Sequence, residues 1–440
     1  MKIAWFTPLS RLSAIGRFSV AVTASLSKMM DVDLCYFDSG DVHDVSINAK
    51  RFRSASSVSA SVLSSYDVVI YNFGNYLPFH QEIYSLSQRW PGVCILHDFV
   101  MHHFFAAYYL EHLRDPGAYR LMLERVYGDA APVVERVWET DEVVRFPLFE
   151  EIVRGSLGAI AHSTFLKERV ETFFAGPVAR IPLAYDKRVP HTEMSRDQLG
   201  IGDGQILVIT VGHVNPNKQV DCVIDALGQL GSMSRSLVYA VLGPIAPDYE
   251  RKLKAAIKER ALESTVLFLG QVSDEILNAY LSAADICINL RFPAIEGASA
   301  SAIEEMLFGK PVIVTNTGFF SELPGDCVVK VRPRNETDVA QALKKLVNDR
   351  SARMALGARA KAFAESEFHP NRYAKELAEF LWEVQSARPV LDVADRVAVE
   401  LWRMGAQAHM SIVENVAREM AEVFDTKGSE PGPAAVYQKS

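Results

Sequence analysis

Short apolar runs alternate with longer segments of helical pattern along most of the chain. Each run has five to eight residues and is rich in Val, Ile and Leu, without strict alternation with polar residues. Such runs favour strands that are buried on both faces of a parallel sheet. They form two series, at residues 2–7, 32–37, 67–72, 92–97, 158–163 and 178–184, and then at 205–212, 237–243, 265–270, 284–290, 311–316 and 327–331. The pattern predicts an α/β protein with two parallel sheets.

A polar stretch separates the two series. Residues 186–204 carry Pro and Gly and lack a hydrophobic period, which is typical of an interdomain linker. We therefore expect one Rossmann-like domain over residues 1–185 and a second over 205–370. Residues 371–425 are expected to hold a helical crossover to the first domain and further C-terminal helices, and 426–440 a disordered tail.

The composition limits the kinds of partner and the cellular location that we expect. The net charge of -8 argues against nucleic acid as the main partner. The five cysteines are widely spaced with no C-x-x-C pair, so we expect free thiols in a reducing cytosol, with no disulfide and no zinc site. We find neither the pattern of a signal peptide nor an apolar run of about 18 residues, which predicts a cytoplasmic protein.

The most informative segment lies between two predicted strands and reads EGASASAIEEMLFGKPVIVTN. It resembles the E-G-x-x-x-x-x-x-E-x-M-x-x-G-x-P-V signature of family 4 retaining glycosyltransferases (group 1 glycosyl transferases), which have the two-domain fold called GT-B. The matched positions are Glu296, Gly297, Glu304, Met306, Gly309 and Pro311. The resemblance covers roughly residues 1–385. It implies transfer of a hexose from a nucleoside diphosphate sugar to an acceptor hydroxyl, with retention at the anomeric carbon.

A helix that opens in this segment would give the matched residues a physical role. Backbone N–H groups of Gly297, Ala298 and Ser299 would point at an anionic ligand, because the first N–H groups of a helix have no partner within it. Glu304 would lie two turns further on the same face, about 12 Å away. That span suits hexose hydroxyls at Glu296 and ribose hydroxyls at Glu304. The alternative is a solvated helix with ordinary surface glutamates.

A second segment, VITVGHVNPNKQVD, looks like the G-R-x-x-x-x-K loop of the same family, in which two cations hold the donor diphosphate. Gly212 and Lys218 match, and Lys218 would neutralise charge on the leaving diphosphate. His213 stands at the arginine position, and histidine offers no permanent charge or bidentate fork. Asn217 adds a donor in the same loop. The alternative is a lysine at an ordinary helix start.

The first loop, TPLSRLSAIGRFS, contains a single glycine where the family has several. We expect Gly16 to be the point of close approach to the donor phosphates, and Arg17 to contact either phosphate or acceptor. The loop does not match G-x-G-x-x-G, so a nicotinamide or flavin cofactor has little support.

Polar residues also follow strands of the first series, at the edge where ligands of open α/β sheets bind. His97 comes directly after a strand, and the resemblance implies that it lies close to the donor sugar. Candidates for the acceptor side are Asp98, His102 and Asn72, together with Arg291, which lies just ahead of Glu296 in the second domain. The histidines could instead suggest a metal, but their spacing does not match a zinc motif. The aromatic residues that follow within 104–109 indicate core packing. The alternative is that they form an apolar surface that contacts a lipid-linked acceptor.

The resemblance implies a catalytic set of Glu296, Lys218 and His97, with no cofactor and no metal. The donor is expected to be a UDP- or GDP-sugar, and the acceptor a saccharide or a lipid-linked sugar in polysaccharide or glycoconjugate biosynthesis. Peripheral contact with the inner face of a membrane and a homo-oligomer formed through the C-terminal helices stay open. Two alternative functions also stay open: a non-catalytic GT-B scaffold, motivated by the missing arginine, and a nucleotide-sugar epimerase.

Overall fold

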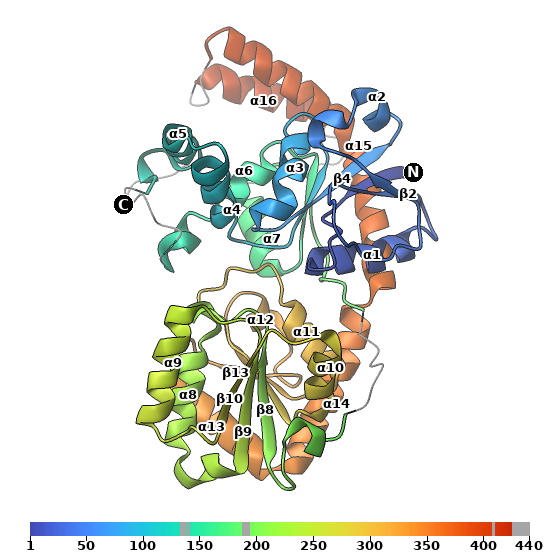
Figure 1. Cartoon of the computed structure of the whole chain (residues 1–440). Coiled ribbons are helices and arrows are strands. Elements are labelled where there is room, and N and C mark those ends of the chain that lie inside the picture. Colours follow the sequence, from blue (N-terminus) through green and yellow to red (C-terminus); the bar gives the residue numbers. More distant parts are fainter. Residues whose placement is uncertain (133–138, 140, 187–193, 407–409, 425–440) are drawn as a thin grey trace.

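The structure is a computed structural model and describes residues 1–132, 139, 141–186, 194–406 and 410–424. Its two α/β domains lie one above the other, each with helices on both faces of a central sheet (Figure 1). Part of the predicted linker and the whole predicted tail lie outside the described residues. The predicted fold class is confirmed.

The first sheet has seven parallel strands in the order β3-β2-β1-β4-β5-β6-β7. Its strands are β1 (Lys2–Phe6), β2 (Asp31–Tyr36), β3 (Ala49–Arg51), β4 (Val68–Phe73), β5 (Val93–Leu96), β6 (Gly158–Ala161) and β7 (Val178–Arg180). Six of them coincide with predicted runs. The apolar pattern misses β3, because this edge strand reads Ala-Lys-Arg and has no buried residue.

The second sheet has six parallel strands in the order β10-β9-β8-β11-β12-β13. Its strands are β8 (Ile206–Val211), β9 (Leu237–Leu242), β10 (Val266–Gly270), β11 (Ile286–Asn289), β12 (Val312–Thr315) and β13 (Val329–Val331). All six coincide with predicted runs. In both sheets the strand order reverses beside the first strand, at β1/β4 and at β8/β11. Ligands of such sheets bind in the crevice at the carboxyl ends of these strands.

Helices cover both faces of each sheet, which is why the strands read as continuous apolar runs. The helices of the first domain are α1 (Ala14–Leu26), α2 (Ala60–Leu63), α3 (Leu77–Ser87), α4 (His102–Ala106), α5 (Pro116–Tyr127), α6 (Phe149–Val153) and α7 (Thr164–Glu171). Those of the second are α8 (Val220–Gln229), α9 (Pro247–Glu259), α10 (Asp274–Ala283), α11 (Ala300–Leu307), α12 (Phe319–Glu322), α13 (Glu336–Asn348) and α14 (Arg350–Glu367). In the second domain α8, α9 and α13 pack on one face of the sheet, and α10, α11 and α14 on the other.

A long helix returns the chain to the first domain. This helix, α15 (Pro370–Arg403), packs against α1. The rings of Tyr373 and Phe18 meet edge to face, with their centroids 5.1 Å apart. Helix α15 continues through Pro389 to Arg403, so part of the region expected to hold further C-terminal helices belongs to the crossover helix itself. Helix α16 (Ser411–Phe424) follows it as a separate element. Among the described helices, none is long and apolar enough to cross a membrane.

Close packing between α14 and the turn after α11 depends on a glycine. A Cβ at Gly357 would lie 2.0 Å from the Gly309 carbonyl oxygen, whereas one at Gly325 would meet no atom within 4 Å. We expect Gly357→Ala to destabilise the protein by about 1–3 kcal/mol through overpacking, despite the better helix propensity of alanine. Urea unfolding should show a lower midpoint for this variant, while Gly325→Ala unfolds like wild type. A higher midpoint would mean that helix propensity outweighs the steric conflict.

Candidate active site

A cavity of about 430 Å³ lies between the two domains, at the carboxyl ends of strands from both sheets. From the first domain it is lined mainly by Ser13, Ile15, Arg17, Phe18, Gly74, Asn75, His80, His97 and Asp98. From the second it is lined by Arg291, Ile295, Glu296, Ala298, Ser299, Ala300 and Ser301. The cavity therefore joins the loops after β1, β4 and β5 to the single loop that follows β11.

The backbones of the two domains meet directly at this cavity. The Gly297 N–H donates to the His97 carbonyl at 2.9 Å, and the Phe99 and Val100 N–H groups both donate to the Ile295 carbonyl at 3.0 Å. A Cβ at Gly297 would lie 2.9 Å from the His97 carbonyl oxygen. The expectation that the Gly297 N–H points at a ligand is therefore wrong. Glycine is needed here because the domains touch.

The helix after this loop begins three residues later than the sequence suggests. Helix α11 starts at Ala300, and the Ser299 hydroxyl caps it by accepting from the Ala302 N–H at 3.4 Å. The Ala300 and Ser301 N–H groups lie in the first turn, where the helix provides no acceptor for them. Because both residues line the cavity, the terminus of α11 offers a place for an anionic group.

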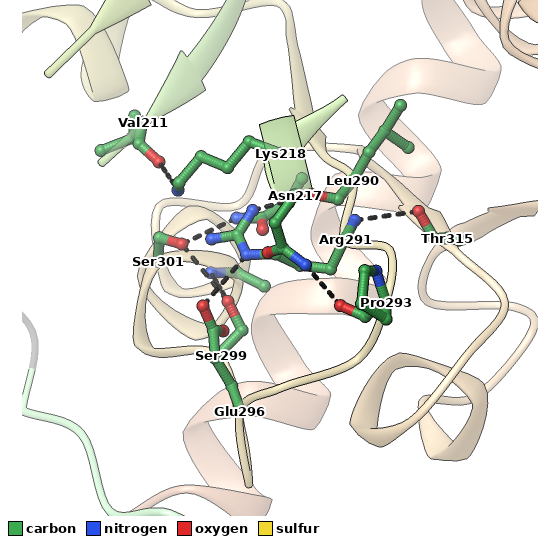
Figure 2. Close-up of polar contacts among 12 residues, drawn as sticks. Val211, Asn217, Lys218, Leu290, Arg291, Pro293, Glu296, Ser299, Ser301 and Thr315 are labelled. Carbon is green, nitrogen blue, oxygen red and sulfur yellow. Dashed lines mark hydrogen bonds and ion pairs between the residues drawn. The ribbon is translucent and has the colours of Figure 1, made fainter. Parts of the chain in front are cut away.

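Glu296 lies on the cavity wall and is paired with a buried arginine. Arg291 Nε donates to Glu296 Oε1 at 3.1 Å, and the Arg291 backbone N–H donates to Thr315 Oγ1 at 3.0 Å (Figure 2). The Arg291 side chain is 5% exposed and that of Glu296 is 31% exposed. The ion pair therefore holds a partly accessible carboxylate in a defined orientation at the cavity.

Lys218 lies behind the cavity wall rather than in it. Its Nζ donates to the Val211 carbonyl at 2.6 Å, and the residue is 7% exposed. Burial, reinforced by the nearby Arg291 cation, lowers the pKa of Lys218 to about 7. Gly212 has a φ of +105°, and a Cβ there would lie 2.7 Å from Lys218 Nζ. Gly212 therefore makes room for the lysine.

Two other residues of the β8 loop lie away from the cavity. His213 is exposed and is not among the described residues that line the cavity. Asn217 Nδ2 donates to the Pro293 carbonyl, and the Asn217 carbonyl accepts from the Phe292 N–H at 2.9 Å (Figure 2). Asn217 thus ties the β8 loop to the loop that carries Glu296.

His97 belongs to a buried chain of contacts. Its Nε2 lies 3.1 Å from Asn72 Oδ1, and its Nδ1 lies 3.2 Å from Nε2 of His162, whose Nδ1 contacts the Ile181 carbonyl at 3.0 Å. Because Asn72 donates through Nδ2 to Phe6, its Oδ1 is an acceptor. Three contacts therefore need three ring protons, whereas two neutral imidazoles carry two. Burial lowers the pKa of both histidines, so one contact lacks its proton near neutral pH.

The first domain adds a histidine that the sequence does not mark. His80 lies within α3, so no strand end identifies it as a site residue. A Cβ at Gly74 would lie 2.9 Å from His80 Nε2 and 3.4 Å from Asp98 Oδ2, so the glycine allows these side chains to approach. Burial raises the pKa of Asp98 to about 7, the Asn75 N–H opposes the shift, and Glu296 adds to it. The cavity therefore holds one carboxyl group, that of Asp98, which can exchange a proton near neutral pH.

Three predicted site residues are not among the described residues that line the cavity. A Cβ at Gly16 would lie 2.8 Å from the Pro8 carbonyl oxygen, so this glycine serves packing within its own loop. His102 is fully buried and contacts the Tyr119 hydroxyl, which places it in the core rather than on the acceptor side. Glu304 is 3% exposed within α11 and is not one of the described cavity-lining residues.

Arg17 lies at the cavity. Its guanidinium stacks over the Tyr185 ring at 5.2 Å, and both residues line the wall. Among the described residues, no three His, Cys, Asp or Glu side chains are grouped so that they could hold a metal ion.

Part of the sequence matches known proteins. Residues 191–363 match the family model of glycosyl transferases group 1. The chain is 30% identical over 207 residues to D-inositol 3-phosphate glycosyltransferase of Nocardia farcinica, which covers 44% of this chain and 45% of that protein. It is 25% identical over 235 residues to lipopolysaccharide 1,2-N-acetylglucosaminetransferase of Salmonella typhimurium. This match covers 50% of this chain and 60% of that protein. The matches thus span about half the length of these relatives.

Solved structures resemble the chain over both domains. HepE of Anabaena in complex with UDP has a TM-score of 0.60 at 19% identity, covering 87% of this chain and 100% of that one. Sucrose-phosphate synthase of Thermosynechococcus elongatus has a TM-score of 0.63 at 17% identity. The match covers 88% of this chain and 100% of that one. At these identities the likeness shows the fold alone. Residues 191–363 therefore resemble the group 1 glycosyl transferases, and the chain as a whole has the GT-B fold.

Proposed function

We propose that this protein is a retaining glycosyltransferase that moves a hexose from a nucleoside diphosphate sugar to an acceptor hydroxyl. The observation that carries the proposal is the position of Glu296 beside the N-terminus of α11, in a cavity between the two domains. A carboxylate that accepts from sugar hydroxyls and a helix terminus that attracts phosphate are the two groups that a sugar nucleotide needs. UDP is the favoured nucleotide, because HepE was solved with UDP.

In the proposed reaction the protein positions the reactants and stabilises the leaving group. The α11 terminus and Lys218 stabilise the charge on the departing diphosphate, and Glu296 holds the hexose. The bond between the anomeric carbon and the diphosphate oxygen breaks, and the acceptor oxygen bonds to the same face of that carbon. The acceptor proton passes to the leaving diphosphate, so no protein nucleophile is required. His97 lines the cavity from the first domain, where it would contact the sugar.

A panel of nucleotides tests the proposal. We expect UDP, at a hundred times its dissociation constant, to stabilise the protein by about 2.7 kcal/mol and to raise the melting temperature measurably. GDP, ADP and TDP are the comparison ligands. A melting temperature that rises with GDP alone would indicate a GDP-sugar, rather than a UDP-sugar, as the donor. Without an acceptor, the UDP-sugar should be hydrolysed slowly. An isomerised donor would instead support the epimerase alternative, and no shift with any nucleoside diphosphate would support the scaffold.

The remaining expectations concern the acceptor and the assembly. We propose a saccharide or lipid-linked acceptor, because one relative is named as a lipopolysaccharide N-acetylglucosaminetransferase. Peripheral contact with a membrane and pairing of subunits through the C-terminal helices stay predictions. So does the cytoplasmic location.

A further inference from the structure

The loop after β8 brings less positive charge to the cavity than its motif predicts. His213, at the position of the expected arginine, is exposed and lies outside the cavity-lining set of described residues. Lys218 is buried behind the wall, and its lowered pKa of about 7 leaves it partly neutral at physiological pH. Each phosphate group of a nucleoside diphosphate carries negative charge, which a buried site must neutralise. A second cation is therefore needed near the α11 terminus.

Arg291 brings a cation to this place from the next strand of the sheet. It follows β11, is 4% exposed as a residue, and lines the cavity. Two bonds hold it in place: the one from its backbone N–H to Thr315, and one from Nη1 to the Leu290 carbonyl at 2.8 Å. Nε is occupied by Glu296. Among the described residues no hydrogen bond engages Nη2, so this edge of the guanidinium has donors left for a ligand.

The available edge of Arg291 shares the cavity wall with the helix terminus. Ser299, Ala300 and Ser301 line the same cavity as Arg291. In Figure 2 the Arg291 side chain is drawn between Lys218 and Glu296, beside Ser299 and Ser301. An anionic group at the α11 terminus would therefore have a guanidinium, rather than a histidine, as its neighbour.

We propose that Arg291 is the second cation that holds the donor diphosphate, in place of the residue at position 213, and that it bridges this diphosphate to Glu296. One edge of the guanidinium keeps the Glu296 carboxylate oriented toward the hexose, while the other edge donates to phosphate. Lysine cannot do both, because an ammonium group is a point charge without the planar fork. The assignment rests on the proposed function, since the diphosphate is that of the donor.

Isothermal titration of inorganic pyrophosphate, UDP and uridine tests the assignment. Arg291→Met should weaken pyrophosphate and UDP by about 10- to 100-fold and leave uridine unchanged, because hydrogen bonds to charged groups contribute on this order. Arg291→Lys should restore part of the affinity for pyrophosphate while donor hydrolysis stays reduced. His213→Ala should bind all three ligands like wild type. Arg235→Met, which removes an exposed arginine of the same domain, is the matched control.

Each outcome decides one of the two proposals. If UDP binds wild type and Arg291→Met equally, or if His213→Ala shows the loss instead, the role of Arg291 is overturned and the transferase proposal stands. If pyrophosphate binds in an Arg291-dependent way but no nucleoside diphosphate binds, Arg291 is confirmed as the anion ligand and the transferase proposal fails. If wild type binds neither pyrophosphate nor UDP, both fail. Should Arg291→Met not fold, unchanged UDP affinity and hydrolysis in Arg291→Lys would overturn the assignment.

Discussion

Replacing Lys218 with methionine is expected to lower kcat/KM for sugar transfer about 100- to 1000-fold without unfolding the protein. Loss of one group that stabilises charge developing in the transition state has this order of effect. Methionine has nearly the volume of lysine, and the Lys218 ammonium is buried with a hydrogen bond to the Val211 carbonyl. Removing a desolvated charge should therefore leave the melting temperature unchanged or raise it. Steady-state kinetics with a UDP-sugar, together with thermal unfolding, measure both effects.

Lys252→Met is the matched control, because Lys252 is exposed on α9 and lies outside the cavity-lining residues. It should transfer sugar at the wild-type rate. Full activity in Lys218→Met would show that this charge is not used in the reaction. A lowered melting temperature alongside lost activity would instead indicate that the lysine is needed for the structure of the β8 loop.

The affinity for UDP is expected to fall by about tenfold or more as the pH rises from 7 to 9. Binding of the diphosphate favours the protonated Lys218, whose pKa in the free protein is lowered to about 7 by burial and by Arg291. Above this pH the lysine must take up a proton when the anion binds, so the dissociation constant rises with pH. The phosphate groups are almost fully ionised throughout this range and contribute little to the slope.

A buried carboxyl group works against this fall. Burial raises the pKa of Glu305 to about 8, and its oxygens accept from Asn289 Nδ2. When Glu305 loses its proton near pH 8, the new negative charge favours the protonated lysine and makes the pH dependence shallower than tenfold per unit. Titration of UDP at several pH values should therefore give a steeper slope for Glu305→Gln and a shallower one for Lys218→Met. A flat profile in the wild-type protein would contradict this account.

The strands could be predicted from the sequence because their signal is local. Twelve apolar runs coincide with strands of the two sheets, since helices on both faces require apolar residues at consecutive positions. The strand β3 has no such requirement, because it lies at the edge of its sheet with exposed or half-exposed residues.

The candidate site could be predicted in its location and only partly in its residues. Glu296 and Arg291 lie at the cavity, and the loops that carry them follow the expected strand. The glycines of the motifs were assigned to ligand contacts, but Gly297 and Gly212 make room for protein atoms, the His97 carbonyl and the Lys218 ammonium. A glycine in a motif indicates a close approach and does not identify the atom that approaches.

By itself the sequence determined the two parallel sheets, the positions of their strands and the loop that carries Glu296. These depend on hydrophobic period, turn residues and motif spacing, which act over short stretches of chain. Only the tertiary structure decided which groups meet at the cavity: that Arg291 pairs with Glu296, that His97 contacts His162, and that His80 lies near Asp98. Such contacts join residues from different elements and domains. They depend on how sheets and helices pack, and no local pattern records that packing.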